Sequence, residues 1–271
     1  MDNIMQDIND KRVLNFSAKN QSDTIEDIEQ HVQNQCSLKI NIDQNCECYV
    51  SDKHCRSLKN IECVVGCNAK LIFLTDRMYD TVDITCMNGS TVYYIQIARL
   101  DMSSYAQSVF VHMQENVRAV VRIFPFLNND ARCIVNTLQE HIASHSTSDL
   151  YVQSLISKNA QFDHKAMIIV PQGVHKNSIA QKTVVFMVGD QCRASAIPSF
   201  NIASKDTCCE HGAAIGICDE LEKWYLNARG LDPKIALRVI TKARCLSSFA
   251  QDLNKNVYNE IALMMDTCLA D

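Results

Sequence analysis

The sequence predicts a mainly β protein that ends in a small helical unit. Strand-length runs of β-branched and aromatic residues follow one another from Cys36 to about residue 205, and the first run alternates apolar and polar residues with a period of two. From Gly216 onward the apolar residues follow helical spacing. With only 7 glycines and 4 prolines in 271 residues, a set of tight hairpins is disfavoured. The predicted core is therefore a sandwich, a barrel or a β-solenoid.

Residues 1–35 form a polar segment with isolated apolar positions. Ile25, Ile28 and Val32 stand at helical spacing, which predicts a short amphipathic helix over residues 23–32. The β-rich core is expected over 36–215. Its strands are predicted at 38–42, 63–65, 70–74, 82–84, 92–97, 109–111, 117–124, 150–152, 167–170 and 184–188. No motif recurs at a crisp interval, which weakens the solenoid on pattern alone.

The helical unit is expected over residues 216–271. Its second helix has a clear start, because Asp232 is a typical N-cap and Pro233 suits the first helical position. A third helix is predicted over roughly 247–269. In the first helix, Trp224 and Tyr225 belong to an apolar stripe. We interpret these two rings as core residues, and the alternative is a groove for a partner.

Composition narrows the class of protein. Hydrophobic residues make up 47% and charged residues 21%, and the net charge is -5, so nothing argues for nucleic-acid binding. Neither a secretory signal nor an apolar run long enough to cross a bilayer is visible. The 14 cysteines include no Cys-x-x-Cys pair, and reduced thiols are expected. A cytoplasmic location is predicted, or the stroma if the source bears plastids.

The densest group of potential metal ligands is Cys208, Cys209, Glu210 and His211, followed by Gly212. If these residues lie on a strand, Cys209 and His211 share one face while Cys208 and Glu210 share the other. A thiolate and an imidazole together can bind zinc, iron or an iron–sulfur cluster. Two ligands are half a site, so the others must come from elsewhere in the chain or from a partner. The alternative is that the thiols only fill buried space.

The residues after this group carry a family resemblance. Residues 216–244 read GICDELEKWYLNARGLDPKIALRVITKAR. A Cys/Glu-x-His strand, a helix with an aromatic pair, Arg-Gly and a second helix resemble the C-terminal segment of the SufB/SufD family, the scaffolds of the SUF iron–sulfur assembly system. The resemblance is specific over roughly residues 130–245. The Cys209-x-His211-Gly212 form resembles the SufD branch, because SufB-type chains carry an acidic residue at the place of Gly212.

Cys192 points to the other branch. It lies in Val-Gly-Asp-Gln-Cys-Arg-Ala, which resembles a SufB segment with an essential cysteine. Because solenoid repeats begin near roughly 20 residues, Cys192 precedes Cys209 by about one coil, and the two thiols are expected to stack on adjacent rungs. The alternative is that Cys192 faces the core as a small apolar residue.

The resemblance implies a right-handed parallel β-helix and a scaffold role rather than an enzyme. It implies a transient iron–sulfur cluster at a subunit interface, with His211, Cys209 and Cys192 as candidate ligands. It also implies pairing with a SufB-like chain, or with a second copy, and docking of the SufC ATPase on the C-terminal helices around 219–245. The chain has no glycine-rich phosphate loop, so it is not expected to bind a nucleotide itself.

Three alternatives remain beside a SufD-like scaffold. The chain could be a SufB-like homodimeric scaffold, or a family member that only dimerises and binds SufC. It could also be a β-helix enzyme acting on polysaccharide. Such enzymes need clustered carboxylates, whereas the acidic residues here are scattered along the sequence.

Overall fold

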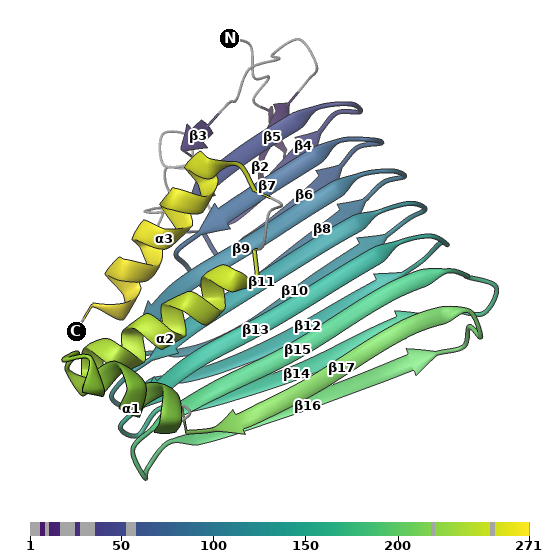
Figure 1. Cartoon of the computed structure of the whole chain (residues 1–271). Coiled ribbons are helices and arrows are strands. Elements are labelled where there is room, and N and C mark those ends of the chain that lie inside the picture. The colour runs from purple at the N-terminus through teal and green to yellow at the C-terminus, as the bar shows by residue number, and fades with distance from the viewer. Residues whose placement is uncertain are drawn as a thin grey trace.

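The chain folds into a parallel β-helix with three helices on one face (Figure 1). The computed structural model describes residues 6–8, 11–16, 25–27, 36–52, 58–217, 220–249 and 253–270. From β2 onward, successive strands alternate between two sheets, and every described pair of neighbours is parallel except β1 with β2. The predicted β-helix is therefore confirmed.

The first sheet contains β1 (Gln6–Ile8), β2 (Lys11–Phe16), β4 (Ser37–Ile42), β6 (Asn60–Val65), β8 (Thr81–Cys86), β10 (Ser104–Met113), β12 (Arg132–His141), β14 (Gln161–Val170) and β16 (Arg193–Ile202). The second sheet contains β3 (Ile25–Asp27), β5 (Glu47–Asp52), β7 (Lys70–Thr75), β9 (Thr91–Leu100), β11 (Arg118–Leu127), β13 (Thr147–Ser157), β15 (Asn177–Val188) and β17 (Thr207–Gly216). Inward side chains of the two sheets form a continuous apolar core that includes Ile40, Phe73, Ile84, Val121 and Phe162.

Asparagine replaces glycine at many turns between the sheets. Asn45, Asn68, Asn116 and Asn129 all have a φ between 54° and 59°, in the left-handed region. Asparagine tolerates this conformation because its short side chain can form local hydrogen bonds. Asparagine therefore allows many tight turns between strands in a chain that has only 7 glycines.

The length of one coil changes along the chain. Ser37 pairs with Asn60, 23 residues later, whereas Gln161 pairs with Arg193, 32 residues later. The strands lengthen from 6 to 10 residues over the same distance. A fixed sequence period therefore does not exist, although the architecture is a solenoid.

The helices are α1 (Glu220–Ala228), α2 (Pro233–Ser247) and α3 (Lys255–Leu269). They lie over the outer face of the second sheet (Figure 1). A second apolar cluster joins sheet and helices and includes Leu74, Ile95, Phe124, Phe249, Ile261 and Met265. Asp232 caps α2 as predicted, accepting a hydrogen bond from the Lys234 backbone N–H at 2.9 Å, with Pro233 in the first turn.

Three predictions about helices need correction. Ile25–Asp27 is a strand paired with β5, because backbone pairing to a sheet edge wins over a weak apolar stripe, and residues 23, 24 and 28–32 lie outside the described part. The third helix begins at Lys255 rather than near 247, since Asn254 caps it there. Trp224 is 65% exposed and Tyr225 is 53% exposed, so neither ring is a core residue.

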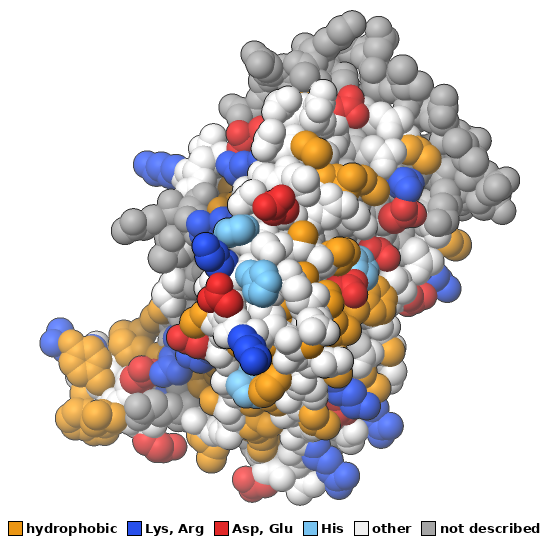
Figure 2. Space-filling model, turned by 90° about the vertical axis from the view of Figure 1, so that its right-hand side faces the viewer, with side chains coloured by type: hydrophobic (Ala, Val, Ile, Leu, Met, Phe, Trp, Pro, Cys, Tyr) orange, Lys and Arg blue, Asp and Glu red, His pale blue; other side chains and the backbone are white. Residues whose placement is uncertain are grey.

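Every helix in the described ranges is too short or too polar to cross a bilayer. On the face shown in Figure 2, acidic and basic side chains are interspersed, and hydrophobic side chains reach the surface on the side of the helices.

Candidate functional site

The β-helix ends in an open rung formed by β16 and β17. Each of these strands is the outermost strand of its sheet and pairs on one side only, with β14 and β15 respectively. Their remaining edges carry no strand partner among the described residues. We call this rung the open end. An unpaired edge of parallel strands is a template for pairing with another chain.

The expected alternation on β17 is confirmed. Cys209 pairs with Ile179 and His211 pairs with Gln181, and both partners on β15 are buried at 2% exposure. Because side chains at paired positions share a face, Cys209 and His211 point into the interior of the β-helix. Cys208 therefore points to the outer face.

Cys209 lies against an apolar cluster that includes Ile168, Ile179 and Ile202. Burial raises the pKa of its thiol, and the neighbouring Cys208 adds to this shift. The thiol is therefore protonated at neutral pH in this state, and a metal would have to displace the proton in order to bind the sulfur.

His211 is exposed at the open end, and its ring contacts one aromatic neighbour. The His211 ring packs edge-to-face against the ring of Phe200 on β16, with 5.0 Å between the ring centroids and 73° between the ring planes. This contact spans the two sheets and leaves the imidazole at the mouth of the interior. Gly212 is not required by packing, because a side chain there would meet no atom within 4 Å.

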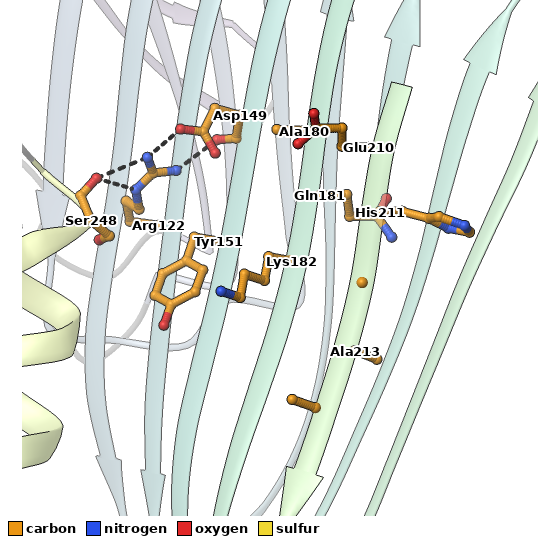
Figure 3. A pocket seen from close by; sticks show the side chains of 12 residues that line it. Arg122, Asp149, Tyr151, Ala180, Gln181, Lys182, Glu210, His211, Ala213 and Ser248 are labelled. Carbon is orange, nitrogen blue, oxygen red and sulfur yellow. Dashed lines mark hydrogen bonds and ion pairs between the residues drawn. The ribbon is translucent and has the colours of Figure 1, made fainter. Parts of the chain in front are cut away.

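A cavity of about 480 Å³ lies over the outer face of the second sheet beside this rung (Figure 3). Arg122 forms one of its walls, is only 4% exposed, and binds the Asp149 carboxylate at 2.5 Å. Its Nε and Nη2 atoms donate to the Ser248 carbonyl at 3.1 and 2.9 Å, so Arg122 fastens the C-terminus of α2 to the sheet. This contact could not be predicted from the sequence, because Arg122, Asp149 and Ser248 are far apart in the chain.

Cys192 does not join the other two candidate ligands. Its side chain is buried, and its thiol lies 3.3–3.5 Å from the carbonyl oxygens of Ile156, Lys158 and Val188 at the turn before β16. The length of β16, ten residues and roughly 33 Å, separates it from the turn that leads to Cys209. The expected stacking of the two thiols is therefore wrong, because one coil here takes about 30 residues instead of 20.

Cys209 and His211 remain together as a pair of inward candidate ligands. Within the described ranges, no group of three or more His, Cys, Asp or Glu residues is placed to hold a metal ion. The pair therefore fits a metal or cluster only if a second chain or the cargo's own sulfide completes the coordination.

Two histidines without a metal-site motif are structural residues of the interior. His141 and His164 are buried, and each has both ring nitrogens hydrogen-bonded, His141 to Ser146 and Ser148, and His164 to Thr137 and Thr183. Gln181 lies beside His211 in the same interior. In the sequence, such buried polar residues can be recognised as polar residues that stand at the otherwise apolar, inward positions of an alternating strand.

The comparison with protein families gives one match, which covers most of the chain. The model described as SUF system FeS cluster assembly, SufBD core domain, matches residues 38–244. No curated protein matches the sequence. The matched range contains nearly all of the β-helix, the open end, and helices α1 and most of α2. The chain belongs to the SufBD core-domain family of the SUF iron–sulfur cluster assembly system.

Proposed function

We propose that the chain is a SufD-like scaffold subunit, which pairs with a SufB-like chain and with the SufC ATPase while an iron–sulfur cluster is built. The observation that carries this proposal is the place of His211 and Cys209: both face inward at a rung whose two outer strand edges have no strand partner in the described part of the chain. A second chain that pairs with these edges would bring its own side chains next to this half-site.

The cluster is cargo in this proposal and not a resident cofactor. His211 is the stronger candidate ligand, because its imidazole lies at the mouth of the interior, whereas the pKa of the Cys209 thiol is raised by burial. Phe200 limits the movement of the His211 ring. The scaffold would contribute ligands, alignment and partial exclusion of water.

A surface for the ATPase is available on the helices. A cavity of about 490 Å³ lies between α1 and α2 and is lined mainly by apolar residues, among them Leu221, Tyr225, Leu226, Val239 and Ile240. The ion pair of Glu222 with Arg244 lies at its rim, at 2.7 Å. Exposed aromatic and aliphatic side chains around a groove are typical of interfaces. We assign this groove to SufC, in line with the family resemblance.

The proposal is tested by His211→Ala in the complex purified with its partners. Cluster content, measured as iron and acid-labile sulfide per complex, is expected to fall by most of its value, while the melting temperature stays the same. The stability is expected to hold because the ring is exposed, and its aromatic neighbour Phe200 is itself 55% exposed. Cys209→Ser should have a smaller effect.

Full cluster content in His211→Ala would contradict the assignment of the site. A sharply lower melting temperature would instead show that His211 is a structural residue. His175, which is also exposed but lies at a turn, is the matched control, and His175→Ala should change neither quantity.

A SufB-like homodimer is the second candidate, and Cys192 favours it. The discriminating measurement is the mass of the chain purified alone and then with an added SufB-like chain. A stable dimer of the chain alone that does not exchange with SufB would favour the homodimer.

A further inference from the structure

The side-chain amide of Gln181 is buried without a hydrogen-bond partner. The residue is 2% exposed, and neither its Nε2 nor its Oε1 atom has a partner among the described residues. Leaving such a group unsatisfied destabilises the folded state, because the amide loses its hydration and gains no partner. Its inward neighbours on β15, Ile179 and Thr183, are smaller or apolar, so packing gives no reason for an amide here.

Gln181 is the direct neighbour of His211 on the preceding coil. The two residues are paired across β15 and β17, and both occupy inward positions of the second sheet. Figure 3 shows the Gln181 side chain beside the base of the His211 side chain. Paired positions on adjacent strands are about 4.8 Å apart, so a ring nitrogen of His211 comes within reach of the amide when the imidazole turns.

The other interior imidazoles show how this β-helix holds a histidine. His164 is bonded at 3.0 Å to Thr137 of the adjacent strand β12, and at 2.7 Å to Thr183 of β15, across the interior in the other sheet. His141 is bonded on both nitrogens by Ser146 and Ser148, at 2.6 and 2.9 Å. At His211 the inward polar side chain on the adjacent strand is Gln181, which occupies the directly paired position.

A histidine that binds metal through one nitrogen needs a partner for the other. That partner accepts the second ring N–H, fixes the tautomer and makes the ligating nitrogen more basic. The amide oxygen of Gln181 can accept this hydrogen bond.

We propose that Gln181 is a positioning residue for His211: its Oε1 atom accepts the ring N–H of His211 that does not bind the metal. This inference rests on the proposed function, because it takes His211 as a metal ligand. Gln181, in the interior of the last two coils, would thus support the half-site of His211 and Cys209 at the open end.

Gln139 provides a matched control. It is also 2% exposed, also faces inward, and also has no partner for either amide atom, but it belongs to β12 and is not paired with His211. Replacing either glutamine by leucine removes a costly buried amide. We therefore expect Gln181→Leu and Gln139→Leu to melt at or above the temperature of the unmodified chain.

The experiment is a titration with Co²⁺ of the full chain assembled with its SufB-like partner, followed by visible absorption. Gln181→Leu is expected to weaken Co²⁺ binding by about 10–100-fold, the usual effect of losing such a partner. Gln139→Leu should bind as the unmodified chain does. Gln181→Glu keeps an acceptor oxygen and should restore the affinity.

Three outcomes would overturn the proposal. Unchanged Co²⁺ affinity in Gln181→Leu, with binding lost in His211→Ala, would show that His211 binds metal without Gln181, and the proposed function would survive. An equal loss in Gln181→Leu and Gln139→Leu would indicate a general change of the interior. Unchanged binding in His211→Ala would remove the half-site itself, and with it the role of Gln181.

Discussion

Individual polar residues inside the β-helix respond to pH. Burial lowers the pKa of both His141 and His164 to about 4, because the charged imidazolium loses its hydration. In the unfolded chain the same groups have a pKa near 6.5. Between these values the unfolded state binds more protons than the folded state, so the free energy of unfolding falls as pH falls from about 6.5 to about 4.

Replacing His164 by Gln should reduce this acid sensitivity. The variant keeps hydrogen-bonding groups next to Thr137 and Thr183 but has no proton to bind. We expect its free energy of unfolding to fall less between pH 7 and pH 5 than that of the unmodified chain, by about 2 kcal/mol. Urea unfolding at each pH measures this. The exposed control His175→Gln should follow the unmodified chain, and a matching slope in His164→Gln would contradict the prediction.

The sequence was sufficient to predict which side chains share a face of β17, but not which residues of other strands surround them. Alternation of side chains along a strand is local, so it correctly placed Cys209 and His211 together. The contact of His211 with Phe200 and its pairing with Gln181 depend on which strands become neighbours. Those neighbours are set by coil length, and coil length leaves no fixed period in this sequence.

At the scale of elements, caps were predictable and helix faces were not. The Asp232 cap of α2 depends on residues two apart, and the structure has it as predicted. The apolar stripe of α1 was interpreted as core, although Trp224 is 65% exposed. An apolar stripe indicates that a helix face is suited to packing. It does not distinguish packing on the chain's own sheet from packing on a partner protein.

Trp224→Ala is therefore expected to act on association and not on stability. An exposed ring contributes little to folding, so the melting temperature should change by less than about 2 °C. Capture of SufC by the immobilised chain should weaken by at least about tenfold if the ring is a hot spot. Phe249→Ala is the contrasting variant: Phe249 is 3% exposed, and its loss should cost about 3–5 kcal/mol. Unchanged SufC capture by Trp224→Ala would remove α1 from the proposed interface.

At the scale of the whole molecule, one outer face of the β-helix is covered by helices, whereas its C-terminal end is left open. Three helices lie over the outer face of the second sheet, while β16 and β17 end the two sheets (Figure 1). Apolar side chains are exposed at this open end. Phe200 is 55% exposed and Ile215 is 43% exposed there. Edge strands with exposed apolar residues favour pairing, so the open end is the surface on which we expect the chain to associate.

Phe200→Asp should weaken this association. A carboxylate at the centre of the proposed interface would lose its hydration on pairing without gaining a partner, whereas in the free chain it stays in water. We expect the assembly with a second SufBD-family chain to dissociate at concentrations at least about tenfold higher, measured by analytical ultracentrifugation. The melting temperature of the free chain should hold, because the ring is more than half exposed. Met102→Asp, at an exposed turn far from the open end, should leave the assembly intact. Equal assembly in the two variants would show that the chain pairs through another surface, and the half-site of His211 and Cys209 would then lie outside the subunit interface.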